Sequence, residues 1–188
     1  MNTMNLQKLV DEASEMALRN MWGEDAYNVN EAILKMDPNN CAACTRLAKY
    51  YKLNDNITEA KNMYLKALVI DPNNRAAINH LYAIEKDQEE SNIVENINTL
   101  KELSKEAQKA LTKGKHNLAE KLYLKAYSME PSLIYAVGLA EAYSKLGKYD
   151  KVEELYKQLL DTHPKKADAE AIEKEFKPLR LKEKILAR

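Results

Sequence analysis

The sequence predicts an all-α protein built as a stacked solenoid of helix pairs, and three observations support this prediction. The 188 residues include 45% apolar side chains but only 4 glycines and 5 prolines, and Lys, Glu, Ala and Leu abound, which favours helices. Apolar residues recur with the 3.6-residue period of a helix. A set of landmark residues also recurs at an interval near 34 residues, which is typical of helix-turn-helix units that bury their apolar faces only by stacking.

The clearest unit spans residues 41–74. Its apolar residues fall on two stripes, over 41–53 and 57–70, so two amphipathic helices should pack antiparallel across the polar turn at 54–56. Alanines let the helix axes approach closely, and tyrosines fill the space beside the crossing. The second helix should stop before Pro72, because proline lacks an amide donor and disfavours helical geometry in the preceding residue. The landmarks of this unit are Leu47, Ala48, Tyr51, Ala60, Tyr64, Ala67 and Pro72.

The other helices follow from further copies of this pattern. Residues 7–40 form a weak copy, supported mainly by the 34-residue spacing between Pro38 and Pro72. Pro178 should kink or end the last helix. The third and fourth copies keep Gly114, Ala119, Tyr123, Ala126 and Pro131 within 100–133, and Leu139, Ala140, Tyr143, Tyr156 and Pro164 within 133–166. In chain order, the expected helices span 4–19, 22–36, 41–53, 57–70, 75–88, 92–113, 117–129, 133–146, 149–161 and 165–186.

The region between the second and third copies predicts a division into two blocks. Residues 75–88 have the apolar pattern of a first helix, but no second helix of the pair follows them. We expect 75–88 and 165–186 to act as capping helices, because the last unit of a solenoid otherwise leaves its apolar face in water. The expected division is an N-terminal block over 1–88, a junction at 89–91 and a C-terminal block over 92–188.

These landmarks resemble the tetratricopeptide repeat family, whose 34-position pattern asks for a large residue, Leu, a small residue, Tyr, Gly, Ala, an aromatic residue, Ala and Pro. Residues 41–74 and 133–166 match at most landmarks, 100–133 mainly in its second half, and 7–40 weakly. The departures are Cys44 at the first large residue, Asp55 at the turn glycine, and Val152 and Leu159 at two alanines of the second helix. The resemblance implies an α-α superhelix of about ten antiparallel helices with end-capping helices. It also implies a non-catalytic interaction module or scaffold that binds a peptide segment of a partner in its concave groove.

Composition argues against several other classes. Twenty-nine basic residues balance twenty-nine acidic ones, so no global field would hold a nucleic acid or an anionic membrane, although the second half is the more basic. No stretch is apolar for the roughly 20 residues that a membrane-spanning helix needs. Residues 1–15 lack the features of an export signal. We therefore expect a cytoplasmic protein with no membrane partner.

No group of residues predicts catalysis or metal binding. Cys41 and Cys44 form a C-x-x-C, but the strand-to-helix context of a redox pair and two further zinc ligands are missing, so we interpret both as small core residues. His80, His116 and His163 lie far apart in the sequence, and none has a second histidine at i+3 or i+4. We expect no enzymatic activity, no metal and no cofactor.

The remaining candidate is the groove. The resemblance implies that positions 2, 5, 6, 9, 12 and 13 of each unit face it, and here these residues are largely basic and polar. They would suit an acidic peptide or a terminal carboxylate. The alternative is that Arg46, Lys49 and Lys52 are only the solvated face of a helix. The carboxylate clamp known in the family is not reproduced. The candidate ligand-binding residues are Thr45, Arg46, Lys49, Lys52, Asn79, Lys105, Gln108 and Glu141.

Two further functions stay open at this point. One is a helical-repeat protein that binds nucleic acid, which the neutral net charge and the lack of stacking aromatics disfavour. Its candidate residues are Lys101, Lys105, Lys109, Lys113 and Lys115, with a basic tail of Lys165, Lys166, Arg180, Lys182 and Lys184. The other is self-association into a homo-oligomer through the weak first unit, around Met4, Leu6 and Val10.

Overall fold

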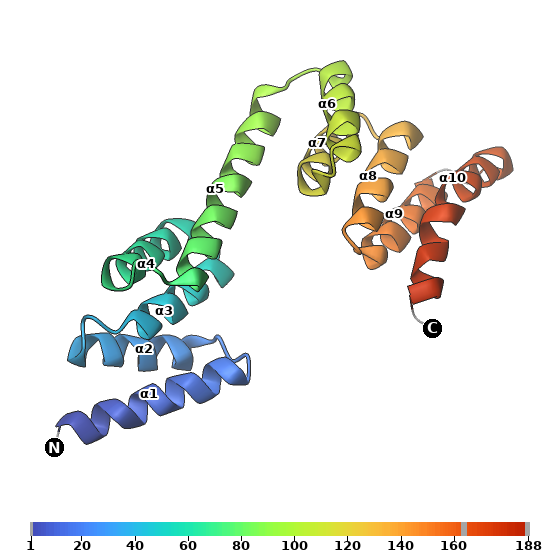
Figure 1. Ribbon diagram of the computed structural model, residues 1–188. Coiled ribbons are helices and arrows are strands. Elements are labelled where there is room, and N and C mark those ends of the chain that lie inside the picture. Colours follow the sequence, from blue (N-terminus) through green and yellow to red (C-terminus); the bar gives the residue numbers. More distant parts are fainter. Residues whose placement is uncertain (1, 163–164, 187–188) are drawn as a thin grey trace. The chain divides into compact units, whose positions relative to one another are not determined.

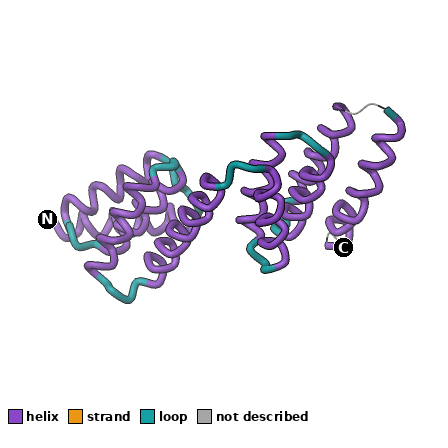
Figure 2. The backbone as a smooth tube through the Cα atoms, turned by 90° about the horizontal axis from the view of Figure 1, so that it is seen from above, coloured by secondary structure: helices purple, strands orange, loops and turns teal. Residues whose placement is uncertain are grey.

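The computed structural model describes the backbone of residues 2–162 and 165–186, and the side chains of residues 4–162, 165 and 167–180. Over these residues the chain is helical throughout, with short loops and no strand (Figure 2). The all-α fold predicted from the sequence is therefore confirmed. The helices of the described chain are α1 (Asn2–Leu18), α2 (Glu24–Met36), α3 (Cys41–Leu53), α4 (Ile57–Ile70), α5 (Arg75–Asn96), α6 (Leu100–Thr112), α7 (His116–Met129), α8 (Leu133–Lys145), α9 (Tyr149–Thr162) and α10 (Lys166–Leu186).

The chain divides into two compact units, Met1–Gln88 and Glu89–Arg188. In the first unit, α1 packs against α2, α2 against α3, and α3 against α4 (Figure 1). Ile33 and Ala43 are fully buried between them, and the first half of α5 adds Ala77 and Leu81 to the core that surrounds Tyr64. The polar turns end in asparagines that cap the following helices, since the side chain of Asn40 accepts a hydrogen bond at 3.0 Å from the amide of residue 43.

The second unit repeats this packing with α6, α7, α8, α9 and α10. Leu103, Leu122 and Leu139 lie in one continuous core, and Ile172 and Phe176 of α10 extend that core at its end. A helical glycine allows α7 and α8 to approach: a Cβ atom added to Gly138 would lie 2.5 Å from Cζ of Tyr123. The close packing of this tyrosine ring therefore depends on the absence of a side chain on α8.

The turns inside the pairs adopt the left-handed conformation that the repeat pattern assigns to glycine. Gly114 and Gly147 have φ values of 70° and 72°, which glycine adopts without steric cost. Asp55, which replaces the turn glycine in the second copy, has φ 57°, a conformation that Asp tolerates better than most residues. The substitution therefore leaves the shape of the turn unchanged.

The junction predicted at 89–91 does not interrupt a helix. Helix α5 runs through it from Arg75 to Asn96, and the break falls at 97–99 instead. Residues 87–90 are Asp, Gln, Glu and Glu, which contain no glycine or proline to end a helix. The true start of the next helix is marked by Thr99, whose hydroxyl accepts a hydrogen bond at 3.3 Å from the amide of Glu102, as in a helix N-cap of the Thr-x-x-Glu type. The other predicted helices agree with the structure within about two residues.

A lysine of the second unit binds the end of α5. Nζ of Lys125 on α7 donates hydrogen bonds to the carbonyl oxygens of Val94 at 2.8 Å, Glu95 at 3.3 Å and Ile97 at 2.7 Å. The last carbonyls of a helix have no partner within it and carry its negative dipole end, so an ammonium group there is favourable. Four residues earlier on α7, Lys121 donates to the hydroxyl of Ser91 at 3.0 Å.

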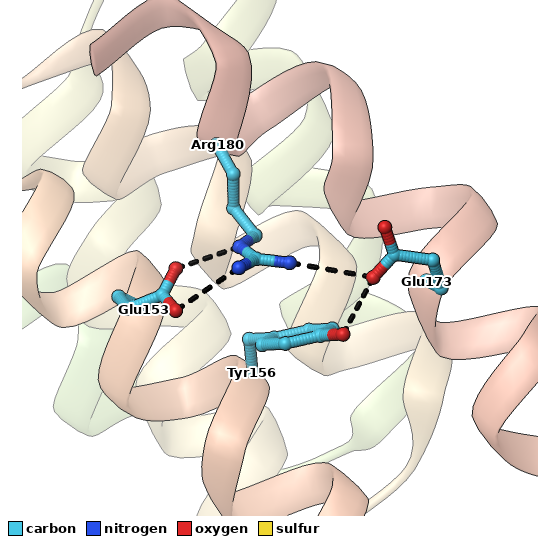
Figure 3. A network of polar contacts seen from close by, with 4 residues as sticks. All are labelled: Glu153, Tyr156, Glu173 and Arg180. Atoms are coloured by element: carbon cyan, nitrogen blue, oxygen red, sulfur yellow. Dashed lines mark hydrogen bonds and ion pairs between the residues drawn. The ribbon is translucent and has the colours of Figure 1, made fainter. Parts of the chain in front are cut away.

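Helix α10 is attached to α9 by an ion-pair network (Figure 3). Arg180 donates two hydrogen bonds to Glu153, at 2.6 and 3.1 Å, and one to Glu173 at 3.3 Å. The guanidinium lies 4.0 Å from the ring centroid of Tyr156, whose hydroxyl donates to Glu173 at 2.5 Å. Pro178 lies inside α10, which continues to Leu186; of the two predicted effects, a kink or an end, the helix does not end at this proline.

Candidate functional site

The groove residues predicted on α3 lie close to a tryptophan that the sequence did not single out. Trp22 lies in the loop between α1 and α2, and Nζ of Lys49 is 3.8 Å from the centroid of its ring. The indole nitrogen of Trp22 donates a hydrogen bond to Asn20 at 2.7 Å, which fixes the ring. An ammonium over an indole face is a cation–π contact, and both groups remain partly exposed.

A histidine of α5 joins the lysines of α3. The pKa of His80 is lowered, first by burial and then by the positive charges of Lys52 and Lys49. Lys52 also lines a cleft of about 360 Å³ together with Ala83 and Asp87 of α5. We call Trp22, Lys49, Lys52 and His80 the basic face of the first unit.

Tyr64 lies beneath this basic face. Its ring stacks on the imidazole of His80, with a centroid distance of 5.1 Å and an interplanar angle of 24°. The side chain is fully buried, and burial raises its pKa to about 12. Its hydroxyl is buried and meets no hydrogen-bond partner among the side chains and backbone that the structure describes. A buried hydroxyl without an acceptor is unfavourable and rare in native proteins.

Arg46, also predicted for the groove, points toward α1. Its Nη2 donates a hydrogen bond to the hydroxyl of Ser14 at 2.8 Å, while Nη1 is buried without a partner. Burial lowers the pKa of this guanidinium. Ser14 was not predicted as a contact, because the first copy of the repeat has few landmarks there. The contact links α3 to α1, so Arg46 has a structural role in the first unit.

Two other residues predicted for the groove, Thr45 and Asn79, make no hydrogen bond with the basic face in the part of the chain described. The hydroxyl of Thr45 donates to the carbonyl of Ala42 within α3 at 2.9 Å, so it is turned toward its own helix. Asn79 is exposed on α5, next to His80 in the chain.

The predicted residues of the second unit lie in a different electrostatic setting. Gln108 on α6 accepts a hydrogen bond at 3.0 Å from the hydroxyl of Tyr123. The pKa of Tyr123 is raised, mainly by burial and also by the negative charge of Glu141 on α8. Lys105 is exposed one turn before Gln108. The structure therefore brings Gln108 and Glu141 together around Tyr123.

The two units place equivalent residues around equivalent tyrosines. Tyr64 and Tyr123 both occupy position 24 of their copies, and each ring packs against position 6 of the following helix, His80 in one unit and Gly138 in the other. Position 9 of the second-unit copy is Gln108, which accepts the tyrosine hydroxyl. Position 9 of the first-unit copy is Lys49. A lysine has donors only, so it leaves the hydroxyl of Tyr64 without an acceptor.

The basic residues proposed for nucleic-acid binding are partly engaged elsewhere. Lys109 forms an ion pair with Glu106 at 2.9 Å, and Arg180 is held by Glu153 and Glu173. The side chains of Lys166, Lys182 and Lys184 lie outside the described residues, as does His163. The described part of this set therefore does not form a continuous row of available cations.

The two cysteines pack as small residues of the first unit. Cys44 is fully buried in its core. The thiol of Cys41 donates to the carbonyl of Ala67 at 3.5 Å and accepts from the side chain of Asn74 at 3.1 Å. Within the described residues no group of three or more His, Cys, Asp and Glu side chains could hold a metal ion. None of the helices described is long and apolar enough to cross a membrane.

Comparison with known proteins identifies the repeats. Residues 42–74 and residues 136–170 each match a family model of the tetratricopeptide repeat. The chain therefore contains tetratricopeptide repeats in both of its units, as the sequence predicted. Repeats of this family generally mediate protein–protein interaction. No curated protein matches the chain.

Proposed function

We propose that the protein is a non-catalytic interaction module that binds a segment of a partner protein on the basic face of its first unit. The observation that supports this most is the cation–π contact between Trp22 and Lys49, which lies on the same helix as Lys52, a residue that lines a cleft with α5. Tryptophan and cationic side chains gathered on one surface are typical of the anchor points of protein interfaces. Two partly exposed lysines favour an acidic segment.

Charge reversal provides the test. The double variant Lys49→Glu/Lys52→Glu should lose its partners in affinity capture from the native lysate followed by mass spectrometry, because the acidic segment would then meet like charges. Capture should also weaken as salt is raised, since exposed ion pairs are screened. Proteins that remain bound to this variant as strongly as to the parent chain would remove the basic face as the binding site.

A matched control separates local from general charge effects. Lys35→Glu/Lys157→Glu makes the same change in net charge at two exposed lysines away from the basic face. This control should keep the partners of the parent chain. Equal loss in both double variants would mean that overall charge, and not this surface, determines binding.

The non-catalytic part of the proposal is supported by the repeat class and by the roles of the titratable residues. Arg180 pairs with both Glu153 and Glu173 and so anchors α10. Tyr123 and Gln108 hold each other by a hydrogen bond. These ion pairs and this hydrogen bond hold the structure together, so the titratable residues in them need no catalytic role to explain their contacts.

A further inference from the structure

Helix α5 exposes apolar side chains at positions that other copies of the repeat bury. With Arg75 as position 1, Ile78 and Tyr82 occupy positions 4 and 8, and they are 45% and 68% exposed. In three other copies the residues at these two positions are fully buried: Cys44 and Ala48 in α3, Leu103 and Ala107 in α6, and Ala136 and Ala140 in α8. The exposure of α5 therefore has a local cause.

The cause is the lack of a second helix in the α5 copy. Helices α3, α6 and α8 are each followed by a short turn and then by a second helix that packs back on them, α4, α7 or α9. Helix α5 instead continues to Asn96, and the described chain then passes to α6, the first helix of another copy. A helix that ends a solenoid usually has a polar outer face, whereas this side of α5 begins with Ile78 and Tyr82.

Helix α4 extends this apolar surface. Lys61 of α4 donates a hydrogen bond to the side chain of Gln88 on α5 at 3.4 Å, which places the two helices side by side. Leu65 and Val69 follow Lys61 at intervals of four residues and so lie on the same side of α4. They are 51% and 84% exposed. We call Leu65, Val69, Ile78 and Tyr82 the open side of the first unit.

The second unit shows which kind of element fills the corresponding place. Helix α9 buries Val152, Leu155 and Leu159, which are spaced as one apolar stripe of a helix. Leu155 also lines a pocket of about 230 Å³ together with Leu124, which is position 25 of its copy. Leu65 is position 25 of the copy that contains α4. The open side therefore corresponds to the surface that an amphipathic helix covers in the second unit.

The charges of the two places differ. In the second unit, Glu154 of α9 lines the pocket beside Tyr143, which is position 11 of α8. Position 11 of α5 is Glu85, and Glu89 follows one turn later; both are exposed. The cation of α4 on this side, Lys61, is engaged with α5. A glutamate at the place of Glu154 would meet a like charge, so a basic side chain is favoured there.

We propose that the open side binds an amphipathic helix of a partner protein, with a basic side chain where α9 carries Glu154. The partner helix completes the α5 copy as its missing second helix, and its apolar stripe covers Ile78 and Tyr82. Recognition of a helix by such a surface depends on apolar anchors spaced like those of α9. Glu85 and Glu89 then select for positive charge at one end of the bound helix.

This surface is separate from the basic face. Lys52 lines its cleft with Asp87 of α5. Asp87 follows Ile78 by about two and a half helical turns, so the two residues lie on opposite sides of α5. The proposal therefore goes beyond the proposed function and does not depend on it. The variant Lys49→Glu/Lys52→Glu should bind a helix on the open side as tightly as the parent chain does.

Two peptides made from α9 test the chemistry of the ligand. Both contain residues 149–162 between alanine-rich ends that favour a helix; one is unchanged and the other carries Glu154→Lys. Each is labelled with a dye and titrated with the full chain by fluorescence anisotropy. The Glu154→Lys peptide should bind at least about threefold more tightly than the unchanged peptide, and salt should reduce the difference. No binding of the Glu154→Lys peptide would overturn the proposal, and so would equal binding of both peptides.

Two double variants of the chain test the location. Ile78→Gln/Tyr82→Gln removes apolar contacts at exposed positions, so the fold should remain as stable as the parent, while affinity for the Glu154→Lys peptide should fall at least about tenfold. Leu18→Gln/Ile134→Gln makes the same change at residues that are 88% and 75% exposed on other helices, and it should keep the parent affinity. An unchanged affinity in Ile78→Gln/Tyr82→Gln, or an equal loss in both variants, would contradict the open side as the binding site.

Sedimentation equilibrium distinguishes a partner helix from a second copy of this chain. The parent chain should remain a monomer as its concentration is raised, because its own amphipathic helix α9 is already packed in the second unit. A parent chain that self-associates, together with an Ile78→Gln/Tyr82→Gln variant that stays monomeric, would assign the open side to a second copy and overturn the proposal.

Discussion

The ring of Tyr123 occupies the space that a side chain at residue 138 would need. Gly138 is buried in the middle of α8, where glycine is otherwise less favourable for a helix than alanine. The close approach of the Tyr123 ring to α8 explains why residue 138 is a glycine, because a Cβ atom would meet that ring. The sequence placed Gly138 at a groove position, but only the structure shows which side chain lies against it.

Gly138→Ala should therefore destabilise the second unit. A Cβ atom 2.5 Å from Cζ of Tyr123 forces the ring away and disturbs its hydrogen bond to Gln108. Overpacking of this kind costs about 1–3 kcal/mol, which outweighs the helix propensity gained by alanine. Chemical denaturation should show the loss. Gly23→Ala is the control, because nothing lies within 4 Å of the added atom and the change should stay within about 0.5 kcal/mol. A Gly138→Ala variant as stable as the parent would show that Tyr123 moves aside freely.

His80 makes the stability of the first unit dependent on pH. Its pKa in the folded chain is lowered below the ordinary histidine value of about 6.5, by burial first and then by the positive charges of Lys52 and Lys49. The unfolded chain thus binds the proton more tightly, so stability is fully present above about pH 6.5 and falls as pH drops toward the folded-state pKa. His80→Gln should reduce this acid sensitivity. Urea denaturation at pH 7.5 and pH 5 would measure it, and identical pH slopes in parent and variant would exclude the effect.

At the scale of elements, most of the helices could be predicted because their ends have local signals. Asn40 caps the start of α3 through its side chain. Pro72, which has no amide donor, follows the end of α4 at Ile70. Both boundaries lie where the sequence predicted them. The end of the helix that begins at residue 75 was predicted at residue 88 because we read a charged stretch as a junction, whereas α5 continues to Asn96. Charged residues favour helices as much as turns, and the decisive signal was the Thr99-x-x-Glu102 cap.

The candidate site was predicted only in part, for a related reason. Lys49 and Lys52 follow from repeat positions alone. Trp22 lies outside those positions, in a loop, so no repeat pattern indicates it. The unpartnered hydroxyl of Tyr64 depends on a comparison with Gln108 in another unit. Such a contrast is visible only after both tyrosines have been placed in three dimensions.

Lys125 should keep the last turn of α5 ordered. In Lys125→Met the apolar stem remains, while three carbonyl oxygens lose their donor. Hydrogen exchange should become about fivefold to tenfold faster at the amides of residues 95–97, with a loss of about 1–2 kcal/mol in stability. Lys113→Met, at an exposed lysine, should leave these amides unchanged. Unchanged exchange in Lys125→Met would mean that the turn is held by other contacts.

At the scale of the whole molecule, each compact unit has its own core, and α5 contributes to both. Ala77, Leu81 and Ile84 belong to the first core, while Val94 and Ile97 pack against the second. Repeat proteins are stabilised by nearest neighbours, so damage in one unit need not reach the other. The extent to which the shared helix couples the two cores can be measured.

Core truncations in each unit should act separately. Ile33→Ala in the first unit and Leu122→Ala in the second each remove a fully buried side chain and should cost about 2–5 kcal/mol. Calorimetry should resolve two transitions, and each variant should shift only one of them. A single transition that moves by the same amount in both variants would show that α5 joins the units into one cooperative block.

Trp22 is the single tryptophan of the chain, and the nearby ammonium of Lys49 lies against its indole. Its fluorescence emission therefore depends on where that one lysine is. A ligand that draws Lys49 away would change the intensity and wavelength of this emission without any attached dye. The protein thus contains an intrinsic optical probe of occupancy at the surface where we expect its partner.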